Sequence, residues 1–404
     1  MTVTSQSKRA GGIPRGLSQT GPVLFSYGFR PFFLGGALWA FAAMALWIAA
    51  LSGLDFAWKY GVSHWHAHEM LFGYASAVLA GFLLTSVPNW TGRLPVSGWP
   101  LLLLFLLWLA GRLALVASDT IGVGVAVAVD LLFLPAMLLI CLREVVAGRK
   151  WNDLKVIAAL LALSLANAGF HYEVLAGGQP ERAHRLAITA YVGLIMIVGG
   201  RIVPSFTRNW INRSGRKDFP APYSSFDTAA IMAGVVGLGL WVALPESILT
   251  AAGAVIAAAF HFVRLYRWRG WTTFSEMLVA ILHVAYLFVP LGFIAISMAA
   301  IGIIDPKSAL HVVTIGTVAL MMLAVTTRAT RSHTGRNPAA SRMTTLSYAA
   351  IVLCALARPV AGFLPDHAPA IYGLSGALWL MAFGLFLIEY GPMLARTRRQ
   401  IRAA

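Results

Sequence analysis

The sequence predicts an all-α fold, a polytopic membrane bundle of about twelve transmembrane helices with both termini in the cytoplasm. Of the 404 residues, 59% are hydrophobic and only 11% are charged, a composition far from that of soluble domains. The apolar residues recur in runs of about 20, the length that crosses a bilayer as a helix. The basic residues gather in alternate short loops, as the positive-inside rule describes.

The apolar runs place the helices in order along the chain. They cover roughly residues 31–53, 66–88, 99–118, 121–142, 154–176, 183–203, 228–244, 248–263, 276–301, 310–327, 346–364 and 369–390. We therefore divide the chain into a cytoplasmic tail (1–22), one transmembrane domain (23–393) and a basic cytoplasmic tail (394–404). The first tail has no apolar stretch of the kind found in signal peptides.

The loop charges predict the orientation. One set of loops carries most of the arginines and lysines, whereas the opposite set holds only Lys59, Arg182, Arg185 and Lys307. Because cytoplasmic loops are enriched in basic residues, the first set and both tails should face the cytoplasm. The formal net charge of +16 therefore reflects topology and lipid contact, and we predict no nucleic-acid partner. Cys141 and Cys354 lie in apolar runs, where free cysteine packs as a small hydrophobic residue.

Histidines gather at the predicted outer ends of the helices. His64, His66 and His68 precede Glu69 at the start of the second helix, and three more lie at the same level: His171, His184 and His311. Ionisable groups at a bilayer are costly and usually functional, and neutral imidazole binds copper, iron and zinc. In a helix, the side chains of His66 and His68 point about 200° apart, so they could serve two different centres. The alternatives are interfacial histidines and buried histidines with satisfied hydrogen bonds.

Embedded arginines add a second signal. Arg112 and Arg358 fall inside apolar runs, and Asp130 could lie near Arg112 because a tight turn joins their helices. One interpretation is a buried ion pair that fixes helix register. The other is that an arginine binds the carboxylate of a cofactor, such as a haem propionate, since guanidinium offers a planar fork of donors. More arginines lie beside Pro, Gly and Asn at the cytoplasmic ends, where charge alone predicts topology and contact with anionic headgroups.

Several of these segments resemble the NnrS family. They are Phe29-Arg30-Pro31-Phe32-Phe33, Trp65-His66-Ala67-His68-Glu69-Met70-Leu71-Phe72-Gly73-Tyr74, Gly81-Phe82-Leu83-Leu84-Thr85 with Asn89-Trp90-Thr91-Gly92, Gly200-Arg201 with Pro204-Ser205-Phe206-Thr207, and Arg328 with His333-Thr334-Gly335-Arg336. The resemblance runs from the first helix to beyond the tenth. It implies a multi-pass protein of the bacterial inner membrane that carries haem, of b type, and copper. It also implies a link to denitrification and nitric oxide resistance.

Carried over residue by residue, the resemblance gives histidine ligands for haem and copper, mostly toward the periplasmic half, to which the embedded arginines and two glutamates are added. The predicted metal ligands are His66, His68, His171, His311 and His283. The predicted cofactor contacts are Arg112, Arg358, Arg30, Arg201 and Arg328. Glu69 and Glu173 are the predicted catalytic residues, as general acids that supply protons.

We expect a haem–copper membrane protein that binds or converts nitric oxide and protects against nitrosative stress. Reduction of nitric oxide, as in an oxidoreductase, would require a respiratory electron donor as a further partner. Two other functions stay open: storage or assembly of haem and copper, and transport without redox activity. The sequence contains no phosphate-binding glycine loop and no catalytic serine or cysteine constellation, which excludes kinases and hydrolases.

Overall fold

The computed structural model describes residues 21–397, so most of the two predicted tails lies outside the described residues. This part of the chain is helical, with no β-strand. Twelve helical spans in it are long and apolar enough to cross a membrane. The predicted all-α, multi-pass fold is therefore confirmed, while the cytoplasmic placement of the termini stays a prediction.

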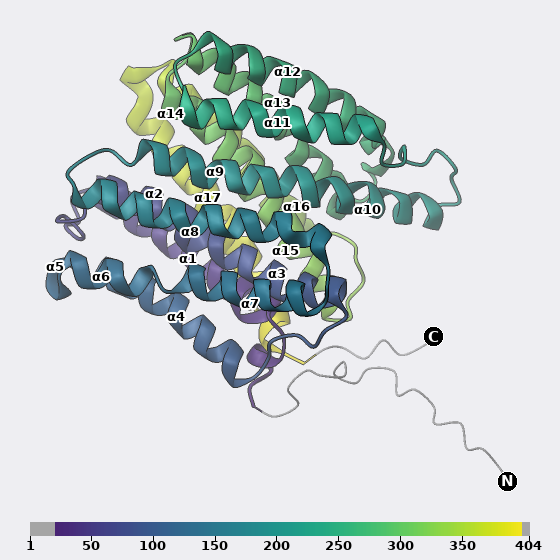
Figure 1. Ribbon diagram of the computed structural model, residues 1–404, viewed down its shortest axis with the longest axis horizontal. Coiled ribbons are helices and arrows are strands. Elements are labelled where there is room, and N and C mark those ends of the chain that lie inside the picture. Colours follow the sequence, from purple (N-terminus) through teal and green to yellow (C-terminus); the bar gives the residue numbers. More distant parts are fainter. Residues whose placement is uncertain (1–20, 398–404) are drawn as a thin grey trace.

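The first six spans contain helices α1 to α10 (Figure 1). In order, they are α1 (Phe29–Leu51), α2 (Val62–His68) continued by η2 (Glu69–Ala75) and α3 (Ser76–Thr91), α4 (Trp99–Val116), α6 (Val123–Asp130) with α7 (Phe133–Ala147), α8 (Leu154–Leu175), and α9 (Glu181–Leu194) continued by η4 (Ile195–Gly199) and α10 (Gly200–Arg213). Short helices η1 (Val23–Ser26), α5 (Ser118–Ile121) and η3 (Trp151–Asp153) precede α1, α6 and α8.

The last six spans complete the bundle. They are α11 (Ser225–Ala243), α12 (Ile248–Arg267), α13 (Met277–Ala300), α14 (Pro306–His311) continued by η6 (Val312–Ala319) and α15 (Leu320–His333), α16 (Arg342–Ala357) with η7 (Arg358–Gly362), and α17 (Ala368–Ala395). Two further short turns are η5 (Gly270–Thr273) and η8 (Pro365–His367).

The ends of several helices follow from capping residues. Ser224 and Asp227 form a reciprocal capping box at the start of α11, which satisfies donors that have no partner inside the helix. Asp305 accepts from the Ser308 backbone N–H ahead of Pro306, which suits the first helical position. Gly92 ends α3 with φ +72°, a conformation that glycine adopts without steric cost.

The largest departure from the predicted boundaries is in the sixth span, which continues to Arg213 instead of stopping near residue 203. The apolar run ends there, but the helix goes on as an amphipathic extension with polar and basic residues. The second span also starts earlier, at Val62. His64, His66 and His68 therefore lie within its first turns.

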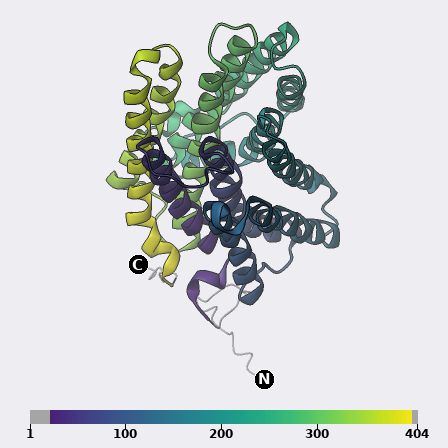
Figure 2. The ribbon, with the colours of Figure 1, turned by 90° about the vertical axis from the view of Figure 1, so that its left-hand side faces the viewer.

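The second, ninth and tenth spans form the centre of the bundle, with 83%, 78% and 72% of their apolar windows buried; most other spans reach only 33–44%. In the end-on view, α17 in yellow lies beside α1 in purple (Figure 2). The start of the first span also contacts the end of the last, since Arg30 Nη1 donates to the Leu394 and Arg396 carbonyls at 2.7 Å each. Both therefore lie at the same end of the bundle.

Three spans contain a π-helical segment beside a predicted site residue. η2 starts at Glu69, η6 starts directly after His311, and η4 ends just before Gly200 and Arg201. A π-helical turn inserts one residue into the helix and is frequent at functional sites because it redirects side chains. All three segments are therefore candidate functional positions.

Candidate metal centre

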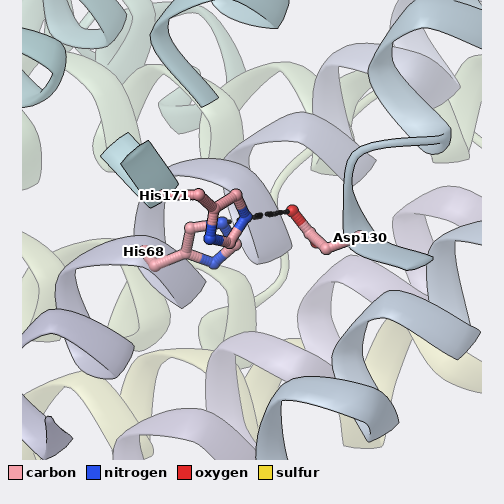
Figure 3. A group of neighbouring side chains, drawn as sticks. All are labelled: His68, Asp130 and His171. Atoms are coloured by element: carbon pink, nitrogen blue, oxygen red, sulfur yellow. Dashed lines mark hydrogen bonds and ion pairs between the residues drawn. The ribbon is translucent and has the colours of Figure 1, made fainter. Parts of the chain in front are cut away.

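His68, Asp130 and His171 meet in the interior of the bundle (Figure 3). Asp130 Oδ2 lies 2.9 Å from His171 Nε2 and 3.3 Å from His68 Nε2. All three side chains are at most 1% exposed. Two imidazoles and one carboxylate facing a common point form a donor set that suits copper, iron or zinc.

The fourth span breaks at Asp130. Helix α6 ends at this residue, and α7 begins only at Phe133. Pro135 explains the break, because proline has no backbone N–H to donate to the carbonyl four residues earlier, that of Leu131. The break turns the Asp130 carboxylate towards α2 and α8.

His68 meets only hydrogen-bond acceptors. Its Nδ1 lies 3.0 Å from Glu69 Oε1, and its Nε2 lies 2.9 Å from Asn167 Oδ1 and near Asp130. A neutral imidazole has one donor and one acceptor nitrogen, so one of these contacts would be repulsive. A cation at Nε2, either a second proton or a metal ion, would remove this repulsion.

Arg112 joins the two carboxylates of the centre. Its Nη1 contacts Glu69 Oε1 at 2.8 Å and Oε2 at 2.7 Å, and its Nη2 contacts Asp130 Oδ1. Trp39 Nε1 also donates to Glu69 Oε2, at 2.5 Å. One guanidinium thus faces two buried carboxylates, and one negative charge is left over while both histidines are neutral. Burial of an unbalanced charge is strongly unfavourable, so the centre attracts a cation.

Asn167 and Tyr60 complete the surroundings. Asn167 Nδ2 donates to Asp130 Oδ2 at 2.9 Å, and the Tyr60 hydroxyl lies 2.9 Å from His171 Nδ1. Burial raises the pKa of Tyr60 well above its usual range, so its hydroxyl keeps its proton and can serve His171 as donor or acceptor. Such outer partners orient metal-binding histidines.

The sequence predicts Asp130 only as an ion partner of Arg112, and it gives Asn167 and Tyr60 no role. A signal for Asn167 exists in hindsight, because it precedes His171 by one helical turn and shares its helix face. Tyr60 lies in a loop, where periodicity carries no information.

Gly73 leaves room for the polar groups. A Cβ at this position would lie 2.5 Å from Glu69 Oε2, 2.7 Å from Trp39 Nε1 and 2.9 Å from Arg112 Nη1. The absence of a side chain therefore lets the carboxylate, indole and guanidinium converge.

We expect Gly73→Ala to destabilise the protein by about 1–3 kcal/mol, because the methyl group forces apart groups that are packed without spare volume. The measurement is thermal unfolding in detergent, with metal content determined on the same sample. Gly193→Ala is a matched control on α9, since a Cβ there meets no atom within 4 Å. Equal melting temperatures for the Gly73 variant and the wild type would contradict this account.

A second group of side chains surrounds His66. Its ring stacks on Trp47 with centroids 4.5 Å apart, and its Nδ1 is buried without a hydrogen-bond partner among the described residues. His311, Arg358 and His184 lie near His66. His311 Nδ1 faces the Lys307 carbonyl at 2.7 Å, and the Arg358 guanidinium stacks on Tyr372 at 4.2 Å. His66 and His68 therefore belong to two separate groups.

The other predicted site residues lie away from both groups or have separate contacts. His283 Nε2 lies 2.7 Å from Thr207 Oγ1. Arg328 stacks on Phe206 at 3.9 Å, and Arg201 lies 3.7 Å from Asp153. Arg30 binds the backbone carbonyls at the end of α17, as described above. Glu173 follows His171 on α8, and its Oε2 is buried with no hydrogen-bond partner in the described part of the chain.

Fold and site together define a multi-pass helical membrane protein with a buried centre of two histidines, two carboxylates and one arginine. The family model described as "NnrS protein" matches residues 23–398, nearly the whole chain. The chain therefore belongs to the NnrS family, and this membership indicates a membrane protein of the nitric oxide response. A comparison with curated proteins gave no match.

Proposed function

We propose that this protein is a haem–copper protein of the bacterial inner membrane that binds nitric oxide at a buried metal centre and so protects the cell. The observation that carries the proposal is the centre of His68, Asp130 and His171, which has one excess negative charge and an imidazole surrounded by acceptors. A divalent metal ion would satisfy both. The donor set fits copper, which takes imidazole nitrogens together with oxygen.

Haem fits the second group better. A haem would be held by the imidazole of His66 or of His311, and the Arg358 guanidinium would bind a propionate. The unpartnered Nδ1 of His66 supports this assignment, because a buried ring nitrogen without a hydrogen bond is costly. Bound iron and copper would supply direct coordination of nitric oxide.

The buried side chains around the centre exclude water from it and hold the metal-binding histidines in place. Nitric oxide is small and apolar, so it dissolves in the bilayer and reaches a buried site. Glu69 accepts from Trp39, Arg112 and His68, and these contacts hold it as a carboxylate that orients His68. We propose that Glu173, on the same helix as His171, would supply protons for reduction of bound nitric oxide with electrons from a respiratory donor.

The proposed orientation places the metal centre towards the periplasm. The ends of α10 and α12 with their arginines lie at the opposite end of the bundle from α2 and α6 (Figure 1). Clustered arginines favour the cytoplasmic side, which supports this orientation.

The test is an optical spectrum of purified protein, oxidised, reduced with dithionite and exposed to nitric oxide, with iron and copper measured on the same sample. We expect a Soret band that shifts with nitric oxide. Loss of the imidazole that would hold the iron, tested with His66→Ala and with His311→Ala, should reduce the haem content strongly. His367→Ala, in the turn η8, is the matched control and should keep the full band.

A colourless protein without iron or copper after haem-replete expression would refute the proposal and favour a transporter. Rapid loss of both metals to acceptor proteins, without any nitric oxide binding, would instead identify a storage or assembly factor.

A further inference from the structure

A cavity of about 580 Å³ lies at the helix ends opposite the metal centre, where α8 and α11 begin and where η4 passes into α10. Its volume is typical of small-molecule sites, which measure about 300–1,000 Å³. None of the predicted metal ligands lines it. Its role is therefore separate from that of the metal centre.

One face of α10 forms a wall of the cavity. The residues that line it there are Gly200, Arg201, Pro204, Ser205 and Arg208. Residues three and four apart share one face of a helix, so this motif presents two arginines and a hydroxyl to the same space. The π-helical segment η4 directly precedes the motif.

The cavity carries excess positive charge. Lys155, from the start of α8, lies near enough to Arg201 for the two cations to repel each other. The carboxylate paired with Arg201 is that of Asp153, at 3.7 Å. Arg208 stacks on the Phe219 ring at 5.8 Å and donates to the Pro220 carbonyl at 3.5 Å. Three cations thus face one space, and one of them, Arg201, pairs with the Asp153 carboxylate.

Asp227 also lines the cavity, but its charge is already balanced. Arg264 Nε lies 3.1 Å from its Oδ1, and Arg267 Nη2 lies 3.4 Å from its Oδ2. Arg264 is fully buried, and its Nη2 has no hydrogen-bond partner within residues 21–397. This Nη2 lies directly against Gly200, where a Cβ would collide with it. The Arg264 guanidinium is therefore a fourth cation, directly behind the wall of the cavity.

The other walls are partly apolar. Ile197, Ile231 and Trp268 line the cavity together with the Pro220–Pro222 segment and Tyr223. An anion that fills this volume would place its charged group beside the basic residues and the rest of the molecule against these walls. Guanidinium forks and a lysine favour phosphate oxygens.

We propose that this cavity binds the phosphate group of an organic phosphate, held by Arg201, Arg208 and Lys155. The phosphate would balance the cations that now repel each other, and the remainder of the ligand would contact Trp268 and Tyr223. Two sources provide this chemistry at a membrane boundary: the headgroup of an acidic phospholipid and a soluble organic phosphate.

The test compares binding to delipidated, metal-loaded protein in detergent. Dioleoylphosphatidylglycerol is the lipid probe and dioleoylphosphatidylcholine its zwitterionic control, both followed by native mass spectrometry. Glycerol 3-phosphate is the soluble probe, followed by calorimetry. The variant is Arg201→Gln with Arg208→Gln. Arg213→Gln, on the same helix but outside the cavity lining, is the matched control.

We expect wild type and the Arg213 variant to bind one of the two anionic probes. The double variant should bind that probe about tenfold or more weakly, because it lacks two of the three cations that would contact the phosphate. Its metal content should stay at the wild-type level, which shows that it folds. Preference for phosphatidylglycerol would identify a lipid, and binding of glycerol 3-phosphate a soluble ligand.

Equal binding of both lipids would overturn the proposal, and so would equal losses in the double variant and the Arg213 variant. Failure of both anionic probes to bind wild-type protein would overturn it as well. None of these results depends on whether the metal centre binds nitric oxide.

Discussion

Asp130→Asn should lower the affinity of the centre for its metal by about 100-fold or more, because loss of an outer hydrogen-bond partner alone costs about 10–100-fold. Asp130 Oδ2 is the oxygen that faces both His68 Nε2 and His171 Nε2. The asparagine keeps the size of the side chain but removes the excess negative charge. The Arg112–Glu69 pair stays intact, so the protein should still fold.

The measurement is metal stoichiometry by mass spectrometry, with electron paramagnetic resonance of the copper-loaded protein. Asp366→Asn, an exposed acidic residue of η8, is the control and should retain wild-type metal content. An unchanged stoichiometry and resonance spectrum in Asp130→Asn would show that the metal binds elsewhere.

Arg112→Met should destabilise the protein by about 3–5 kcal/mol, the usual cost of removing one partner from a buried ion pair. Both Glu69 and Asp130 lose their guanidinium contact, and neither carboxylate can reach water because each is at most 1% exposed. Methionine fills most of the arginine volume, so the loss would come from charge. Unfolding in detergent with increasing dodecyl sulfate measures this effect.

The matched control removes the charges together. Arg112→Met combined with Glu69→Gln and Asp130→Asn leaves no buried charge among these three residues, and it should recover most of the lost stability. If the triple variant unfolds as easily as Arg112→Met alone, charge balance does not explain the role of Arg112.

Several features of the fold follow from the sequence because they depend on local composition. Twelve apolar runs of sufficient length predict twelve spans, and the helical angle between His66 and His68 predicts that they serve different surroundings. The structure confirms both: His68 contacts Asn167 and Asp130, whereas His66 stacks on Trp47. The boundaries in polar helix extensions were predicted less well, since hydropathy falls before the helix ends.

The composition of the centre depends on contacts between helices. Asp130 and Asn167 come from helices far from His68 in the chain, and Tyr60 comes from the loop before α2; no periodicity links them. His66 and Arg358 also come together only through helix packing. So do Lys155 and α10, which line the same cavity.

The sequence by itself thus determined the number of spans and the membrane class, and it named His68 and His171, two of the three residues that meet at the candidate metal centre. Hydropathy and helical period are properties of stretches of about 20 residues. They can therefore be read from the sequence without knowing how distant segments pack. Only the tertiary structure decided which carboxylate contacts which histidine and which buried charge has no partner. It also decided which arginines line the cavity. The physical reason is that distances between side chains on different helices depend on how the helices pack and bend, as the break before Pro135 illustrates.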